Sequence, residues 1–250
     1  MNRTLNRTLN RTVALLAAFA LCLCLGCASH PAGQGFNPKY QAEAQALVDK
    51  SAQAVADMLA DEDYAFFRES LPSARGVLIV PNFYRLGFVW GAGGGQGVLL
   101  ARDQSGHWGS PAFYRLLRGS LGLLAGVEKA TLIFLIMDEA MVEDCLETGP
   151  DFGMGVGITL IEDVARTGVE TRVTDKPVYL FVRSEGLYAG LAFQGGQFAV
   201  EHGLNESFYH WDGITPRQIV LERAVFNTGA AKLVQALSVP YPEESVPVLD

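Results

Sequence analysis

From residue 76 onward the sequence consists of short apolar runs separated by glycine and other turn-forming residues. Runs of this length and composition are typical of β-strands, and short links between successive strands favour antiparallel pairing. The first three runs are Gly76–Val80, Leu86–Trp90 and Gly97–Ala101. Pro81-Asn82 separates the first two runs and the glycine-rich stretch Gly91–Gly97 separates the next two, so we expect three strands of an antiparallel meander.

The later apolar runs extend this pattern. Ala130–Met137 is apolar apart from one threonine, and its length and β-branched content favour a strand that is buried on both faces. The other strand-like runs are Ala112–Leu117, Gly153–Ile161, Pro177–Arg183 and Gly190–Phe193.

Apolar residues recur at helical spacing in three segments. From Tyr40 to Leu59 the repeat spans about five turns, and the opposite face is acidic. Asp138–Glu147 has the pattern of a short helix, and Ile214–Leu237 that of a final helix divided into two pieces near Thr228-Gly229. We therefore expect a single α+β domain with a largely antiparallel β-sheet core and flanking helices.

The balance of charge limits the partners of such a domain. The chain has 19 basic and 27 acidic residues, and Arg3, Arg7 and Arg11 lie in a segment without acids. Without those three arginines, 16 basic residues remain against 27 acidic ones, a formal charge of −11. Binding to nucleic acid depends on lysine and arginine contacts with phosphate, so we do not expect nucleic acid as a partner.

The N-terminus has the pattern of a secretion signal. The three arginines precede thirteen uncharged apolar residues, Val13–Leu25. Such a stretch is too short for a confident membrane span but is typical of the apolar region of a signal peptide. An ordinary cleaved signal peptide and a retained membrane helix remain open at this point.

Leu25-Gly26-Cys27 resembles the end of a bacterial lipoprotein signal, in which the cysteine is lipidated. Cys24 stands where that pattern has an aliphatic residue. The resemblance implies a signal peptide over residues 1–26, acylation of Cys27, and a lipid-anchored protein of the bacterial cell envelope, at the outer membrane and facing the periplasm. Residues 27–39 are expected to form a flexible tether, 40–238 the folded domain and 239–250 a C-terminal tail.

No motif in the chain predicts catalysis, a metal site or a cofactor. The sequence GAGGGQG at residues 91–97 lacks the sixth-position glycine of a dinucleotide fingerprint, so we interpret it as a tight connection or a closely packed backbone. Ser120 lacks the preceding glycine of a hydrolase elbow, and the four histidines are not at metal-ligand spacing. Cys145, in a helical pattern, is expected at the boundary of the core. We expect a protein that is not an enzyme.

An ordered set of segments carries a resemblance to a known family. The segments are SARGVLIVP at 73–81, GVLLAR at 97–102, GHWGSPAFY at 106–114, GSLG at 119–122, SEGLYAGLAFQG at 184–195 and NESFY at 205–209. In this order they resemble the SYLF-domain family, over roughly residues 41–237. The resemblance implies a lipid-binding module, and eukaryotic relatives bind phosphoinositides or contact actin.

The resemblance implies binding of phospholipid or another amphiphile at a membrane surface, without catalysis. Two routes are open: an apolar cavity lined by GFVWG, FLIM and GLAF residues, or a headgroup site made of arginines. The headgroup candidates are Arg75, Arg85, Arg102, Arg115 and Arg118. The family motif positions, expected to be structural, are Gly76, Pro81, Gly97, Trp108, Pro111, Gly186, Gly190, Asn205 and Tyr209.

The alternative function is that of a structural or partner-binding envelope scaffold with no lipid ligand beyond its own acyl anchor. In that case a protein partner in the envelope would meet an aromatic contact surface. The expected members of that surface are Phe113, Tyr114, Phe208, Tyr209 and Trp211.

Overall fold

The computed structural model describes residues 36–87, 90–121, 126–147, 158–161, 177–185 and 196–238. The predictions made for residues 1–26, for most of the tether, for Gly190–Phe193 and for residues 239–250 concern segments outside these ranges.

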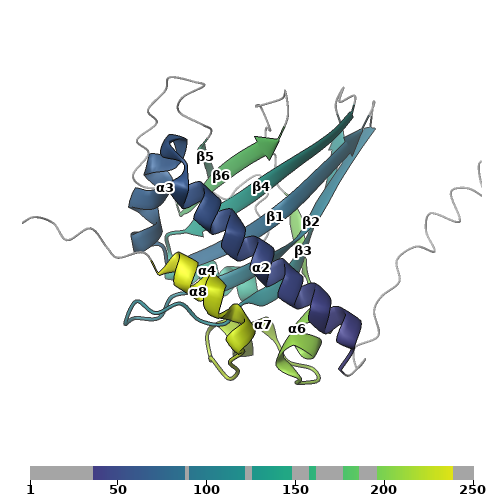
Figure 1. The fold of residues 1–250 in the computed structure, drawn as a ribbon, viewed down its shortest axis with the longest axis vertical. Helices are drawn as coiled ribbons and strands as arrows, with labels where there is room; N and C mark the ends of the chain where they lie inside the picture. The colour runs from purple at the N-terminus through teal and green to yellow at the C-terminus, as the bar shows by residue number, and fades with distance from the viewer. Residues whose placement is uncertain are drawn as a thin grey trace, which may run out of the picture. The chain divides into compact units, whose positions relative to one another are not determined.

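A seven-stranded sheet forms the centre of the domain, in the order β5-β6-β4-β1-β2-β3-β7 (Figure 1). All neighbouring strands pair antiparallel except β5 and β6, which are parallel. The predicted largely antiparallel α+β fold is therefore confirmed. The strands are β1 Gly76–Gly87, β2 Trp90–Ala101, β3 Ala112–Leu121, β4 Gly126–Ile136, β5 Ile158–Ile161, β6 Val178–Glu185 and β7 Gln197–Val200.

Helices cover both faces of this sheet. The predicted first helix is confirmed but begins at Pro38, because the Asn37 side chain caps it and proline suits its first turn. The helices are α2 Pro38–Ala60, α3 Ala65–Ser70, α4 Glu139–Glu147, α6 His202–Tyr209, α7 Pro216–Val220 and α8 Ala231–Leu237, with 3₁₀ turns η1 Glu62–Tyr64, η2 Leu71–Ser73 and η3 Thr228–Ala230.

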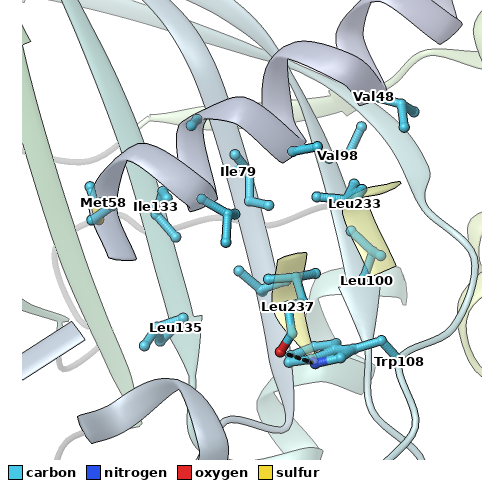
Figure 2. Close-up of a cluster of buried hydrophobic side chains, with 14 of the residues drawn as sticks. Val48, Met58, Ile79, Val98, Leu100, Trp108, Ile133, Leu135, Leu233 and Leu237 are labelled. Carbon is cyan, nitrogen blue, oxygen red and sulfur yellow. Dashed lines mark hydrogen bonds between the residues drawn. The ribbon is translucent and has the colours of Figure 1, made fainter. Parts of the chain in front are cut away.

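The long helix α2 runs diagonally across one face of the sheet (Figure 1). Its buried side, which includes Val48 and Met58, packs on strand residues from the middle of the sheet. Figure 2 shows Ile79, Val98 and Ile133 among these strand residues. The amphipathic pattern of α2 therefore serves to cover a sheet.

Helix α8 lies beside α2 and extends the same core. Leu233 and Leu237 of α8 are fully buried with Leu100 of β2. The indole Nε1 of Trp108 donates a hydrogen bond of 2.9 Å to the carbonyl oxygen of Leu237 (Figure 2). This bond joins the link between β2 and β3 to the C-terminal helix.

A second core lies on the opposite face, against α4 and α7. Leu132, Phe134 and Ile136 of β4 point into it, while the residues between them point toward α2. The prediction that Ala130–Met137 forms a strand buried on both faces is thus confirmed. Cys145 of α4 is buried in this second core, as expected.

The predicted strand Leu86–Trp90 is not a separate strand, which corrects the sequence prediction: Leu86 and Gly87 end β1, and Trp90 begins β2. β1 continues through Pro81-Asn82, where its register against β2 shifts between Ile79 and Tyr84. Proline has no N–H to donate, and it is tolerated here because the ladder is already interrupted by this irregularity.

The glycine-rich stretch at residues 91–97 is not a link but part of β2, which is a second correction. A Cβ on Gly95 would lie 2.5 Å from the carbonyl oxygen of Asn82, and one on Gly97 would lie 2.6 Å from that of Ile79. The glycines therefore let the backbone of β2 lie close to the irregular part of β1. The interpretation as closely packed backbone is confirmed, and only the secondary structure was wrong.

Candidate binding groove

A groove of about 500 Å³ lies between the first half of α2 and the glycine-rich half of β2. Its volume is within the range of roughly 300–1,000 Å³ that is usual for small-molecule sites. Residues from the middle of β1 and β3 complete its walls. The lining residues are Glu43, Ala46, Leu47, Lys50, Asn82, Tyr84, Gly94, Gly95, Gln96, Arg115, Leu116 and Leu117.

Missing side chains on β2 create this space. Val98 and Leu100 point toward α2 and fill the interface there. Because side chains alternate along a strand, Gly94 and Gln96 occupy the next positions on the same face. Gly94 contributes no side chain, and Gln96 reaches sideways to donate a hydrogen bond of 2.7 Å to Glu43 of α2. The sheet and the helix therefore remain separated beyond Val98.

Two large apolar side chains in the groove are exposed to solvent. Tyr84 of β1 is 47% exposed and Leu117 of β3 is 54% exposed. Large apolar side chains that stay exposed next to a cavity are a common feature of ligand and partner sites. The groove therefore presents an apolar surface that an apolar ligand could cover.

Three charged side chains surround this apolar surface. The Arg115 guanidinium pairs with the Glu201 carboxylate, and this hydrogen bond raises the pKa of Arg115 further above its usual value. Arg115 is therefore a permanent cation. Lys50 of α2 is exposed and has no hydrogen bond or ion pair with any residue that the structure describes. Glu43 is held by Gln96.

Of the three predicted headgroup arginines whose side chains the structure describes, Arg75, Arg102 and Arg115, only Arg115 lines the groove. Arg85 and Arg118 both pair in register with Gly93, so their backbones flank the same position of β2. Arg75 is exposed at the opposite end of β1.

Arg102 is used inside the fold. Its guanidinium donates a hydrogen bond to the carbonyl oxygen of Pro72 and lies 4.6 Å from the centre of the Trp108 ring. Burial, and secondarily the charge of Arg75, lowers the pKa of this guanidinium. The side chain of Arg102 thus connects η2 to the link between β2 and β3.

Among the family motif positions, Asn205, Pro111 and Tyr209 take part in hydrogen bonds inside the fold. The amide of Asn205 accepts a hydrogen bond from the N–H of Phe113 (2.9 Å) and donates one to its carbonyl oxygen (3.2 Å). The Tyr209 hydroxyl donates to the carbonyl oxygen of Pro111 at 2.6 Å. These bonds fix α6 to the start of β3. Gly186 and Gly190 lie outside the described residues.

The predicted aromatic contact surface is wrong. Phe113, Tyr114 and Phe208 are at most 1% exposed, and Tyr209 is half-buried. Only Trp211 is exposed. The reason is that β3 and α6 pack their aromatic rings against each other, as the edge contact between Phe113 and Phe208 shows.

The cavity expected from GFVWG, FLIM and GLAF residues is not the groove. The first three residues of FLIM, Phe134–Ile136, are buried in the two cores. Residues 88–89 and 190–193, from the other two segments, lie outside the described ranges. The sequence signal for the observed groove was the glycine run itself, opposite a helix with small residues such as Ala46.

Two features are absent from the described residues. No three His, Cys, Asp or Glu side chains come together there as a metal-ligand cluster. No helix within those ranges has both the length and the apolar character needed to cross a bilayer.

The fold and groove define an α+β domain with a ligand-sized groove beside its longest helix. Residues 118–239 match the family model described as Ysc84, Las17-binding protein actin regulator. Over these residues, just under half of the chain, it is therefore similar to the Ysc84/SYLF family, in agreement with the resemblance found in the sequence.

Relatives of the chain carry matching names. SH3 domain-containing YSC84-like protein 1 of Xenopus laevis is 26% identical over 163 residues, or 64% of this chain and 48% of the relative. Protein YSC84 of Saccharomyces cerevisiae is 24% identical over 172 residues, or 67% of this chain and 36% of the relative. The chain thus spans about half or less of the length of these relatives.

Proposed function

We propose that this chain is a lipid-anchored envelope protein whose domain binds phospholipid or another amphiphile, without catalysis. The observation that carries the proposal is the groove between α2 and the glycine-rich half of β2, with Tyr84 and Leu117 exposed in its walls. The anchor is the acyl group expected on Cys27.

An amphiphile fits the distribution of side chains in the groove. Its apolar chain would cover Tyr84 and Leu117, and each buried CH₂ group contributes about 0.8 kcal/mol. A phosphate or carboxylate headgroup would meet Lys50 and Arg115, both of which line the groove. Lys50 is available because it has no partner among the described side chains.

The names of the relatives support a binding role for the domain. Two of them are named as LAS seventeen-binding protein 3, both from Saccharomyces cerevisiae, and their identity to this chain is 23%. These names describe binding, not catalysis, and they concern proteins that are longer than this chain. For this chain we propose the amphiphile as ligand because the groove has the chemistry to hold one.

The proposal is tested by filling the groove. The exposed side chain of Ala46 lines the groove, whereas Ala42, also exposed and one turn earlier on α2, does not. We expect Ala46→Trp to lower the affinity for a fluorescent phospholipid at least about tenfold, a change of about 1.4 kcal/mol. Ala42→Trp, the matched control, should bind as the parent does.

A charge variant tests the headgroup contact. Lys50→Glu should weaken binding of an anionic phospholipid, and Lys39→Glu on the same helix should not, because Lys39 lies outside the groove. The purified chain should also release phospholipid on solvent extraction, detected by mass spectrometry. Absence of bound lipid together with equal binding by all four variants would reject the groove and favour the scaffold function.

A further inference from the structure

Phe36, His210 and Trp211 are three exposed aromatic residues beside the start of α2, here called the aromatic end. Phe36 is 53% exposed and Trp211 is 46% exposed. The ring of Phe36 stacks on that of His210, with centroids 4.8 Å apart and an angle of 24° between the planes. None of the three residues lines the groove.

The backbone holds this surface in place. His210 ends α6 in the left-handed conformation with φ of 53°, and the N–H of Trp211 donates to the carbonyl oxygen of Glu206 at 3.1 Å. The N–H of Asn37 reaches the Ser207 hydroxyl at 3.3 Å, so the residue after Phe36 is tied to α6. Because the rings of Phe36 and His210 already stack on each other, covering them with another apolar phase costs little conformational entropy.

We propose that the aromatic end is the surface with which the domain contacts the lipid bilayer. This inference rests on the proposed acyl anchor at Cys27. Phe36 is the ninth residue after Cys27 in the sequence, and nine residues of chain reach at most about 30 Å. The end of the domain that carries Phe36 is therefore held near the membrane surface. Aromatic rings, tryptophan above all, prefer the interface between lipid headgroups and acyl chains.

The position of the groove agrees with this orientation. Glu43 and Lys50 lie 5 and 12 residues beyond Pro38, which corresponds to about 8 and 18 Å along the axis of α2. A lipid that leaves the bilayer beside the aromatic end would reach the groove within roughly half the thickness of a bilayer.

The charges near the aromatic end indicate that the contact is apolar. Lys39 and Asp212 are both exposed there, and they carry opposite charges. Neither sign of charge dominates, so the contact needs no anionic lipid. This separates the aromatic end from a basic membrane-binding surface, whose affinity follows the surface potential of the bilayer.

The test measures the membrane contact of single labelled positions in the full, acylated chain on phosphatidylcholine vesicles. Trp211→Cys and Phe36→Cys each introduce a thiol for an environment-sensitive fluorophore. Ala56→Cys is the matched control, since Ala56 is exposed on α2 about 27 Å from Pro38. The native Cys145 is buried and does not compete for the label.

We expect the labels at positions 36 and 211 to shift to shorter emission wavelength on the vesicles. Their quenching by aqueous iodide should fall several-fold, while the label at position 56 remains fully quenched. Equal quenching at all three positions would overturn the inference. So would a chain without an acyl group on Cys27, or protection that requires a second protein, which would make the aromatic end a protein contact.

Lipid binding by the groove is measured on the same vesicle-bound chain with Ala46→Trp. Protected labels together with a groove that binds no phospholipid would reject the groove alone. A lipid-filled groove together with exposed labels would reject the membrane contact alone. Groove binding and membrane contact are thus distinguished in one experiment, whereas absence of the acyl group would overturn the anchor and the membrane contact together.

Discussion

The β1–β2 hairpin has two halves, both paired antiparallel, that differ in the size and burial of their side chains. In the first half, Gly76–Ile79 pairs with Val98–Ala101, and the large side chains are completely buried. In the second half, Tyr84–Gly87 pairs with Gly91–Gly94, and Tyr84 is exposed. The register shift between Ile79 and Tyr84 separates the two halves.

This difference shows that side-chain volume, not strand pairing, decides where the sheet packs tightly against the helices and where a groove remains. In the first half, branched side chains fill the space under α2 and α8 (Figure 2). In the second half, glycine leaves that space empty while the hydrogen-bonded ladder continues. A groove is thus obtained without interrupting the sheet.

The largest loss of stability is expected from adding a side chain where the two halves of the hairpin meet. A Cβ on Gly97 would lie 2.6 Å from the carbonyl oxygen of Ile79 and 2.9 Å from Cγ2 of Val80. We expect Gly97→Ala to lower the free energy of unfolding by about 4 kcal/mol or more, since buried backbone has to move. Urea unfolding followed by circular dichroism measures this change.

The control for that prediction is Gly109→Ala. A Cβ there would meet its nearest atoms at 3.4 Å or more, which is ordinary contact. We expect a change within about 1 kcal/mol. Equal destabilisation by the two variants would mean that the close approach of β1 and β2 at Gly97 is not what requires glycine.

The next largest effect comes from comparing one leucine in each environment. Leu100 is completely buried under α8, and Leu117 is 54% exposed in the groove wall. We expect Leu100→Ala to cost about 3 kcal/mol of stability, the usual result of opening a cavity in a core. Leu117→Ala should change stability by less than about 0.5 kcal/mol while weakening amphiphile binding. Similar unfolding midpoints for both variants would contradict the comparison.

A pair of tryptophans gives a smaller effect. Trp108→Phe removes the donor to the Leu237 carbonyl oxygen and leaves that buried acceptor unpaired. We expect a loss of about 2 kcal/mol in thermal or urea unfolding. Trp211→Phe, at an exposed position, should leave stability within about 0.5 kcal/mol. A stability loss for Trp211→Phe as large as that for Trp108→Phe would place Trp211 in the core.

The smallest effect is a pH dependence from the second core. Burial, and secondarily the charge of Asp144, raises the pKa of the Cys145 thiol from 9.0 to about 12. The unfolded chain therefore loses this proton at lower pH than the folded chain, and the stability contributed below pH 9.0 is lost as pH rises toward about 12. At about pH 10 the loss should be about 1.4 kcal/mol.

The matched variant for this measurement is Cys145→Ala. Other buried groups, such as the Tyr209 hydroxyl, also have a raised pKa and act in the same direction. The thiol contribution is therefore the difference between parent and Cys145→Ala in their change of stability from about pH 8 to about pH 10. An equal change in both proteins would show that the Cys145 thiol does not contribute.

Much of the architecture follows from local sequence. The period of apolar residues predicts α2, and the unbroken apolar run of β4 predicts a strand with two buried faces, because both patterns depend only on neighbouring residues. The family resemblance rests on ordered local segments for the same reason. The division of the last helical region into α7 and α8 was also predicted, from Pro216 and Thr228-Gly229.

Tertiary structure alone decided which side chains meet. The sequence predicts five arginines as equivalent headgroup candidates, but the fold uses Arg102 to contact η2 and places Arg115 in the groove. The groove depends on the register of β1 against β2 and on the path of α2 above them. A sequence pattern states the periodicity of each element, whereas register and packing are set by contacts between residues far apart in the chain.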